Sequence, residues 1–341
     1  MSAPATHPVT APVLTVEGLE KRFAVRGTFG RNAKTVHALS EVSLSVRKGQ
    51  TVGIVGESGC GKSTVARVIM GLIRQDDGII RLHGQPSDHL PASLKKRRRI
   101  VQMVFQDSSA SLNPRLNIEA SIMFAPMVNG TSRDEARTHA HHLLERTGLD
   151  PAQFAGRYPH ELSGGQRQRV NIARALALRP ELIIFDEAVS ALDKSVEAQV
   201  LNLLLDLKKE FDLSYLFISH DLNVVHYISD DLVVMYLGQI VERGPADLIY
   251  AHPGHPYTRA LLAAMPNPDP ETRTETAPVF GDPPSPIDPP SGCRFHTRCP
   301  FAEAVCEASQ PDQQRIGADH DVACHMADGT SGHSRAGSIE Q

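Results

Sequence analysis

The chain has 341 residues, of which 41% are hydrophobic and 22% charged, which is ordinary for a soluble globular protein and long for one domain. Its formal net charge of −4 at pH 7 argues against a protein that binds nucleic acid by electrostatic attraction. The sequence has no run of 18 or more uncharged apolar residues, and its N-terminus lacks the pattern of a secretory signal. We therefore expect a cytoplasmic protein that meets a membrane only through partner subunits.

Short apolar segments alternate with helical segments along most of the chain. Residues 1–12 contain three prolines and are predicted to form a loose tail. Strands are predicted at 13–19, 42–46, 51–56, 80–84, 99–105, 182–186, 215–219 and 231–238, and helices at 63–73, 132–149, 166–179 and 195–211. Several apolar strands separated by helices favour an α/β fold with a largely parallel sheet.

The composition changes after residue 250. Residues 251–292 are dense in proline and contain one short predicted helix, from about Tyr257 to Ala264. A proline-rich segment of this length favours an extended, semi-rigid arm over a packed core. Four of the five cysteines follow in the last fifth of the chain. We therefore predict three parts: the tail at 1–12, a large α/β domain at 13–250 and a C-terminal extension at 251–341.

A glycine-rich segment between a predicted strand and a predicted helix fits the pattern G-x-x-x-x-G-K-[ST]. Its residues are Gly56, Glu57, Ser58, Gly59, Cys60, Gly61, Lys62 and Ser63, with Thr64 following. Glycines let backbone N–H groups turn toward phosphate oxygens, and the helix adds the positive end of its dipole. Lys62 would supply a cation to the β- and γ-phosphates, and Ser63 a hydroxyl to Mg²⁺. Cys60 is either a filler residue or a thiol whose pKa the positive loop lowers.

The apolar strand at 182–186 ends in two carboxylates, Asp186 and Glu187. A buried parallel strand carries its carboxyl end to the sheet edge where the phosphate loop also lies. One carboxylate can hold Mg²⁺ through water while the next polarises the attacking water. An acidic pair at a strand end is by itself as often structural as functional. Together with the phosphate loop, it indicates a nucleoside triphosphate hydrolase.

A second candidate anion site lies ahead of this strand, at Leu162, Ser163, Gly164, Gly165 and Gln166. A serine and two glycines at a helix start leave backbone N–H groups open to an anion. The segment matches the LSGGQ signature, and at this point the chain resembles the ATP-binding-cassette (ABC) ATPases. The resemblance implies a phosphate-loop, RecA-like ATPase core with a helical subdomain at about 107–168. It also implies that the signature faces ATP bound by a second subunit.

Further residues match functional positions of the ABC family. Gln106 matches the Q-loop glutamine, which touches Mg²⁺ and the attacking water, and His220 matches the switch histidine at the γ-phosphate. Asp193 matches the D-loop aspartate of the subunit interface, and Phe23 the aromatic residue that stacks on adenine.

The resemblance also implies which groups hold Mg²⁺ and which one performs the hydrolysis. Ser63, Gln106 and Asp186 would hold Mg²⁺, and Glu187 would activate water. The family often has Pro after this glutamate where this chain has Ala188, and Tyr where it has Phe23. Neither change removes a catalytic group, so we expect an active ATPase.

Three segments resemble the ATPases of oligopeptide and dipeptide importers: 105–115, 186–204 and the His-Pro-Tyr-Thr element at 255–258. This resemblance spans about residues 13–325 and implies a peripheral ATPase on the cytoplasmic face of the inner membrane that powers peptide uptake. The implied partners are a homologous second ATPase in a heterodimer, two transmembrane permeases and an extracytoplasmic solute-binding protein. Import of another small solute such as nickel is an alternative. A soluble ABC ATPase acting on nucleic acid or ribosomes is a less favoured one, given the acidic chain and single cassette.

The C-terminal cysteines follow the pattern Cys293-x5-Cys299-x6-Cys306-x17-Cys324. In a reducing cytoplasm, four thiolates suit zinc or an iron–sulfur cluster better than disulfides. The spacing lacks the tight pairs of structural zinc sites, and the pattern resembles cluster-binding members of the importer family. We therefore expect a [4Fe-4S] cluster that staples a segment with little core, with zinc or with free or disulfide-linked thiols as alternatives.

Overall fold

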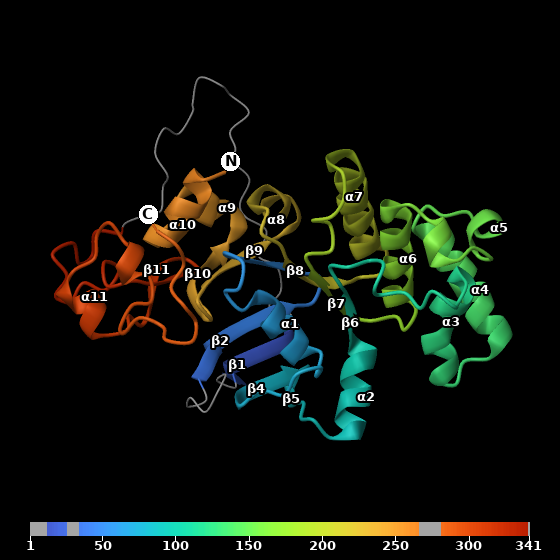
Figure 1. The fold of residues 1–341 in the computed structure, drawn as a ribbon, viewed down its shortest axis with the longest axis horizontal. Helices are drawn as coiled ribbons and strands as arrows, with labels where there is room; N and C mark the ends of the chain where they lie inside the picture. The colour runs from blue at the N-terminus through green and yellow to red at the C-terminus, as the bar shows by residue number, and fades with distance from the viewer. Residues whose placement is uncertain (1–11, 26–33, 266–280, 340–341) are drawn as a thin grey trace.

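The computed structural model describes residues 12–25, 34–265 and 281–339. Within these residues the strands form two sheets (Figure 1). The smaller sheet has the order β2 (Lys34–Arg47), β1 (Pro12–Val25), β4 (Asp77–Leu82) and β5 (Gln85–Pro86). The larger sheet has the order β11 (Gln313–Gly317), β12 (His320–Ala323), β10 (Gln239–Pro245), β9 (Asp231–Tyr236), β3 (Thr51–Val55), β8 (Ser214–Ile218), β7 (Leu182–Asp186) and β6 (Val101–Val104).

The five strands β9, β3, β8, β7 and β6 pair in parallel, which confirms the predicted sheet type. Every residue of β3, β7 and β8 is buried, because helices or the smaller sheet cover both faces of these strands. Alternate residues serve the two faces. Ile183 and Phe185 of β7 pack into one hydrophobic core, whereas Leu182 and Ile184 pack into the other.

Helices and the smaller sheet divide between the two faces of the larger sheet. The core on one side includes α1 (Lys62–Ile69) and strands β1, β2 and β4. The core on the other side includes residues of α6 (Gly164–Leu176), α7 (Lys194–Glu210) and α8 (Leu222–Ile228). These helices and strands pack on both faces of β3, β7 and β8, so the ends of these three strands are held in fixed positions.

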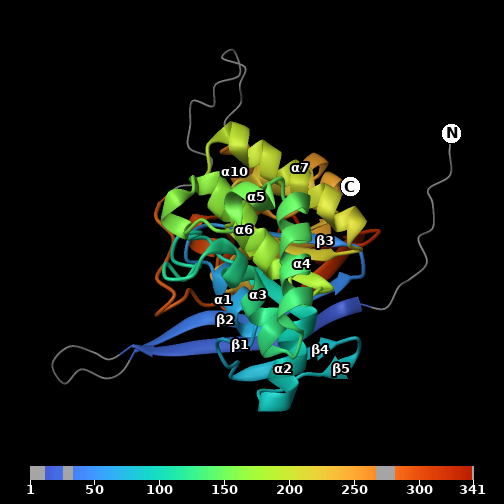
Figure 2. The same cartoon turned by 90° about the vertical axis from the view of Figure 1, so that its right-hand side faces the viewer.

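A helical region lies at one end of the molecule, between β6 and β7 in the chain, and it faces the viewer in Figure 2. It contains α3 (Ile118–Val128), α4 (Arg133–Arg146), α5 (Pro151–Phe154) and the short 3₁₀ helix Pro159–Glu161. Helix α4 begins with a capping box, in which Ser132 and Glu135 bond each other's backbone N–H groups. Helix α2 (Pro91–Ile100) precedes β6.

The C-terminal extension lies against the edge of the larger sheet, at the left of Figure 1. Strand β12 pairs with β10 in an antiparallel manner, with Glu242 opposite Val322, so part of the extension continues the sheet. The extension also contains α10 (Pro256–Ala263), close to the helix predicted there, and α11 (Ala304–Ala308), and it follows α9 (Ala246–Ala251). No helix among the described residues has the length and apolar character needed to cross a membrane.

A buried carboxylate joins β10 to the extension. Glu242 is completely buried, and its oxygens accept hydrogen bonds from the backbone N–H groups of Gly254 (2.7 Å) and His255 (2.9 Å). The Nε2 atom of His320 lies 2.7 Å from the same carboxylate. The imidazole of His255 then caps α10, because its Nδ1 atom accepts the N–H of Tyr257 at 3.0 Å. This network holds the start of α10 in place.

His255 is expected to make the protein less stable in acid. Burial lowers the pKa of His255 to about 4, with Glu242 opposing and Arg259 adding to the shift. Between the ordinary pKa of 6.5 and pH 4, the unfolded chain binds a proton that the folded chain does not. The free energy of unfolding should therefore fall as the pH falls through this range, by roughly 3 kcal/mol in total from this group.

Denaturant unfolding of the wild type and of His255→Asn at pH 7 and pH 5 checks this result. Asparagine can still accept the Tyr257 N–H but does not titrate, so the variant should lose less stability than the wild type on acidification. An equal loss in the two proteins would contradict the assignment.

Candidate functional site

The segment from Gly56 to Gly61 forms a compact loop between β3 and α1, and Lys62 and Ser63 begin the helix. Gly56 has a φ of 148° and Gly61 a φ of 108°, both outside the range that other residues favour. Space is also restricted, since a Cβ atom on Gly56 would lie 2.2 Å from the carbonyl oxygen of Met235. The two glycines therefore allow a backbone path that side chains would block.

Lys62 lies inside this loop. The residue is 4% exposed, and its Nζ atom donates to the carbonyl oxygens of Gly56 (2.7 Å) and Glu57 (2.9 Å). Helix α1 begins at Lys62, so the positive end of its dipole adds to the ammonium charge. Backbone N–H groups, a helix start and a buried ammonium group together form an anion-binding cradle.

Cys60 does not have the lowered pKa that we considered for it. The residue is 3% exposed, and burial raises the pKa of its thiol although Lys62 opposes the shift. The thiol lies 3.7 Å from the Lys62 Nζ atom. Because the neutral thiol is favoured, Cys60 is a buried residue of the loop rather than an activated nucleophile.

Ser63 and Asp186 meet at the junction of α1 and β7. The Ser63 hydroxyl donates to Asp186 Oδ1 at 2.7 Å, and Asp186 is 4% exposed. Burial raises the pKa of Asp186, while the hydrogen bond from Ser63 opposes that shift. A hydroxyl and a carboxylate beside a phosphate cradle fit Mg²⁺, which prefers oxygen ligands and keeps several waters. Gln106, the third predicted ligand, lies against Glu187 instead of bonding Ser63 or Asp186.

Three predicted catalytic residues come together from the ends of three parallel strands. Glu187 follows β7, Gln106 lies two residues beyond β6, and His220 lies two residues beyond β8. Glu187 Oε2 accepts a hydrogen bond from Gln106 Nε2 at 3.0 Å and lies 3.4 Å from His220 Nδ1. The strand order β8-β7-β6 places Glu187 between the other two. The arrangement puts one carboxylate next to one amide and one imidazole.

The backbone of Glu187 has an unusual conformation. Its φ is 50°, in the left-handed region that non-glycine residues seldom adopt. The Glu187 N–H donates to the carbonyl oxygen of Ile218 at 2.9 Å, which holds this conformation in place. Such strain costs on the order of 1 kcal/mol and is typical of functional sites. Here it coincides with the carboxylate that lies between Gln106 and His220.

The signature residues form the start of α6. Ser163 caps this helix, and its backbone and side chain exchange hydrogen bonds with Gln166 (2.9 and 3.3 Å). Gly164 and Gly165 form the first turn, and Leu162 is buried. In the described part of the chain, no hydrogen bond or ion pair joins these residues to the phosphate loop. The structure therefore does not bring the two candidate anion sites of one chain together.

The last two predicted site residues lie away from these contacts. Asp193 is exposed and precedes α7, where its carbonyl oxygen accepts the N–H of Glu197 at 2.8 Å. Phe23 lies on β1, is 36% exposed and has the Lys21 Nζ atom 5.3 Å from its ring centroid. Their roles stay predictions.

The expected [4Fe-4S] cluster is wrong. Among the described residues, which include all four C-terminal cysteines, no group of three or more His, Cys, Asp or Glu side chains could hold a metal ion. All four cysteines are free thiols that line one small pocket. Burial raises the pKa of Cys293 to about 11 and of Cys324 to about 12. Burial therefore favours the protonated thiol at these two positions of the folded chain.

Two residues beside the phosphate loop had no predicted role. Arg298 forms an ion pair with Glu57 at 2.9 Å, and the Tyr257 hydroxyl accepts the Glu57 N–H at 2.8 Å. Tyr257 belongs to the His-Pro-Tyr-Thr element, which marked it as notable without indicating its contact. Arg298 lies among cysteines, and no local pattern links it to a residue 241 positions earlier.

Comparison with known proteins agrees with this site. Residues 39–190 match the family model described as ABC transporter, and residues 241–306 match that of the oligopeptide/dipeptide transporter C-terminal region. A probable peptide ABC transporter ATP-binding protein of Sinorhizobium fredii is 49% identical, covering 92% of this chain and 90% of that protein. The oligopeptide transport ATP-binding protein AppF of Bacillus subtilis is 48% identical, covering 92% and 97%.

Solved structures show the same fold. CbiO1 from Clostridium perfringens, part of an ABC transporter complex, has a TM-score of 0.62 and 26% identity, covering 71% of this chain and 91% of that chain. A dimeric ATP-binding cassette in a post-hydrolysis state, bound to ADP and Pi, has a TM-score of 0.59 and 28% identity, covering 68% and 98%. The phosphate loop, the paired carboxylates and these similarities lead to one assignment: the chain belongs to the ATP-binding subunits of the ABC transporter family.

Proposed function

We propose that this ATPase powers the uptake of di- and oligopeptides through partner permease subunits. The main support for ATP hydrolysis is that Glu187 contacts both Gln106 and His220, beside the Ser63–Asp186 pair. The peptide substrate is supported by the matching C-terminal region and by relatives named for peptide transport. These relatives do not favour import of nickel or action on nucleic acid or ribosomes.

The residues divide the work of ATP hydrolysis. The loop from Gly56 to Thr64 cradles the phosphates, with Lys62 neutralising their charge. Ser63, Asp186 and Gln106 would hold Mg²⁺, which neutralises charge on the phosphates when it is bound. Glu187 orients and polarises the attacking water as general base.

Three further roles follow the family pattern. Phe23 would stack on adenine, and His220 would contact the γ-phosphate. Asp193 would lie at the interface between two ATPase subunits.

Two ATPase subunits are needed to complete each site. In the described residues, the signature of one chain has no hydrogen bond or ion pair with its own phosphate loop. A helix start with Ser163 and two glycines suits a phosphate supplied from outside the chain. One related cassette was solved as a dimer with ADP and Pi. The proposed partner is a homologous second ATPase, which makes a heterodimer.

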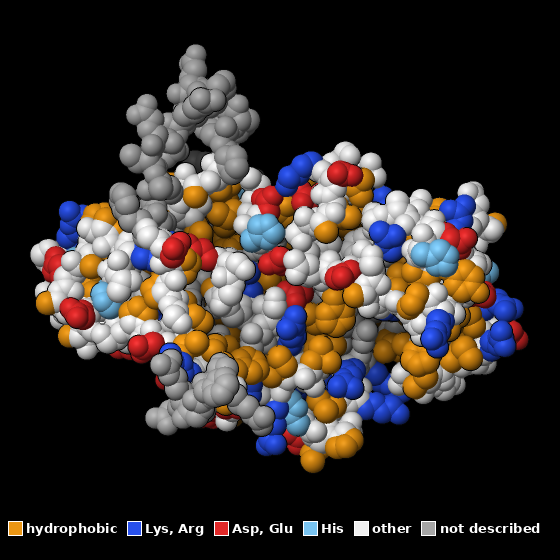
Figure 3. Space-filling view, in the orientation of Figure 1, with side chains coloured by type: hydrophobic (Ala, Val, Ile, Leu, Met, Phe, Trp, Pro, Cys, Tyr) orange, Lys and Arg blue, Asp and Glu red, His pale blue; other side chains and the backbone are white. Residues whose placement is uncertain are grey.

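Contact with a membrane would come through two permeases, on the cytoplasmic face. Helix α3 has three exposed apolar side chains: Phe124 (63% exposed), Met127 (43%) and Val128 (67%). Figure 3 shows hydrophobic side chains at the surface in the lower right, in the region of α3. Exposed apolar side chains that lie together favour a protein interface. A solute-binding protein would deliver the peptide from outside.

The test is to reconstitute the chain with its permeases, second ATPase and binding protein and to measure ATP hydrolysis. Peptides of two to several residues should stimulate hydrolysis when the loaded binding protein is present, and nickel salts should not. Stimulation by nickel but not by peptides would overturn the proposed substrate. ATP hydrolysis absent from every combination would overturn the proposed activity.

A further inference from the structure

The side chain of Glu57, in the phosphate loop, is bound by the C-terminal extension. Arg298 donates from Nη1 to Oε2 at 2.9 Å and from Nη2 to Oε1 at 3.0 Å, so the contact is bidentate. The Arg298 side chain is 7% exposed and that of Glu57 25%. Bidentate, charge-assisted bonds with little exposure are far less screened than surface ion pairs. This contact joins residues 241 positions apart in the chain.

The backbone of Glu57 is bound by the extension as well. Its N–H donates to the Tyr257 hydroxyl at 2.8 Å. Tyr257 is completely buried, and its ring packs against those of Tyr236 (4.7 Å between centroids) and Phe295 (5.4 Å). Its helix, α10, is held in turn by the buried network of Glu242. Both polar ends of Glu57 are therefore held by rigid parts of the extension.

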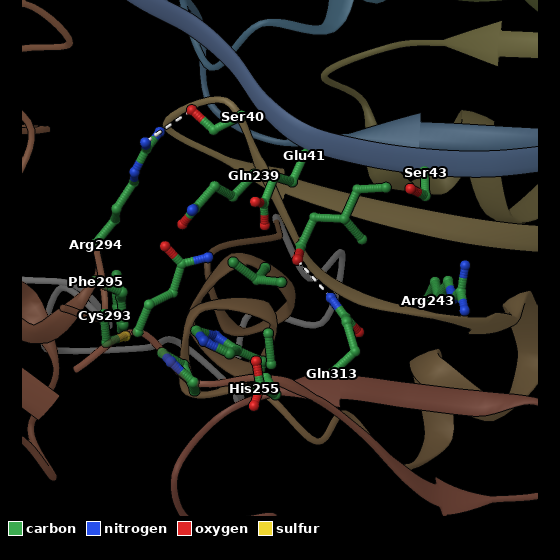
Figure 4. Close-up of a pocket in the computed structure, with 16 residues that line it drawn as sticks. Ser40, Glu41, Ser43, Gln239, Arg243, His255, Cys293, Arg294, Phe295 and Gln313 are labelled. Carbon is green, nitrogen blue, oxygen red and sulfur yellow. Dashed lines mark hydrogen bonds between the residues drawn. The ribbon is translucent and has the colours of Figure 1, made fainter. Parts of the chain in front are cut away.

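Arg298 itself is held close to the loop by the residues before it. Arg294 bonds Ser40 Oγ at 2.8 Å and the carbonyl oxygen of Leu237. Figure 4 shows the Arg294–Ser40 bond at a pocket between the extension and strands β2 and β10. Phe295 is 2% exposed and packs edge-on against Tyr236. Arg294 and Phe295 thus hold the start of the turn that carries Arg298 (His296–Arg298).

Fixing Glu57 also fixes the surroundings of Lys62. The Lys62 ammonium donates to the carbonyl oxygens of Gly56 and Glu57, and the extension binds Glu57 through its backbone N–H and its carboxylate. A shift of this half of the loop would move the cation that faces the phosphates. Because the Glu57 N–H is bound to Tyr257, the phosphate cradle depends on the N–H groups that follow it.

We propose that the C-terminal extension is a working part of the nucleotide site, with Arg298 and Tyr257 as positioning residues for the phosphate loop. This inference rests on the proposed ATPase function. It assigns the extension a role in binding ATP, in addition to any contact with transporter subunits. Loss of the contact should weaken ATP binding and leave the hydrolytic step at Glu187 nearly unchanged.

The test compares variants in the assembled transporter, with ATP hydrolysis measured over a range of ATP concentrations. Arg298→Ala should raise the KM for ATP about tenfold and change kcat less than about twofold. Arg298→Lys keeps the charge but loses the two-pronged geometry, so its KM should lie between those of Arg298→Ala and the wild type. Tyr257→Phe, which removes only the hydroxyl, should raise the KM by a smaller factor.

Arg315→Ala is the matched control. Arg315 also lies in the extension and pairs with Asp321, but it is on β11, away from the loop. Replacing Arg315 by Ala should leave the KM for ATP at the wild-type value.

A double variant gives a second check. Adding Arg298→Ala to a chain that already carries Glu57→Gln should leave the KM at the value of Glu57→Gln alone. The pair then shows the coupling expected of residues that act through one contact.

Three results would overturn the inference: a wild-type KM in Arg298→Ala, equal rises in Arg298→Ala and Arg315→Ala, or additive effects of Glu57→Gln and Arg298→Ala. If Arg298→Ala does not fold, Arg298→Lys and Tyr257→Phe decide, and wild-type KM values in both would overturn it. These failures differ from failure of the proposed function, in which the wild-type complex itself would not hydrolyse ATP.

Discussion

Replacement of Glu187 by Gln is expected to lower ATP turnover at this site by at least about a hundredfold, while ATP remains bound. Glutamine preserves the size of the side chain and can still contact Gln106 and His220, which lie 3.0 and 3.4 Å from the carboxylate. It cannot accept a proton from water, so the chemical step is lost and the phosphate cradle is kept. The variant should therefore trap the closed, ATP-bound pair of subunits.

Loss of hydrolysis is measured as ATP turnover in the assembled complex. Retention of bound ATP is measured as the amount of ATP that remains with the protein after gel filtration. Glu181→Gln is the matched control, since Glu181 immediately precedes β7 at its opposite end and has a half-exposed side chain. It should hydrolyse ATP at the wild-type rate. Wild-type turnover in Glu187→Gln would show that another group activates the water.

Gly61→Ala is expected to abolish ATP binding and to lower the free energy of unfolding by more than about 2 kcal/mol. Gly61 precedes α1 with a φ of 108°, which alanine does not tolerate. A Cβ atom there would also lie 2.5 Å from the carbonyl oxygen of Ala38 and 3.1 Å from a methyl carbon of Leu39. The backbone would have to move away from β2, and the loop would move with it.

Gly59→Ala separates the two causes. Gly59 also has a positive φ, 79°, but a Cβ atom there would meet nothing within 4 Å. This variant should lose only the cost of the left-handed backbone, about 1 kcal/mol, and keep measurable ATP binding. Denaturant unfolding and titration with a fluorescent ATP analogue compare the two proteins. Equal losses in both would show that the close approach to β2 has no importance.

The nucleotide motifs were predictable because the functional residues of each motif are adjacent in the sequence. The turns at Gly56 and Gly61 need glycine at those positions, and Lys62 must follow at the start of a helix. The apolar strand that ends in Asp186 is likewise a local pattern. The parallel sheet followed from the alternation of such strands with helices.

The cysteine cluster shows where a local pattern was insufficient. The spacing of Cys293, Cys299, Cys306 and Cys324 is compatible with a ligand set, but spacing says nothing about how side chains are oriented or solvated. In the structure, burial raises the pKa values of Cys293 and Cys324, and no metal-binding group is formed among the described residues. The protonation state depends on desolvation, which is a property of the packed chain.

The sequence alone determined that this chain folds around a phosphate loop, a signature helix and an acidic strand, since each is specified by neighbouring residues and their backbone preferences. Tertiary structure decided which strand ends meet, and so placed Gln106 and His220 on either side of Glu187. It also decided that Arg298 and Tyr257 bind Glu57. Contacts across such distances depend on how the sheet and the extension pack, because no local pattern of residues encodes the partner of a side chain 241 positions away.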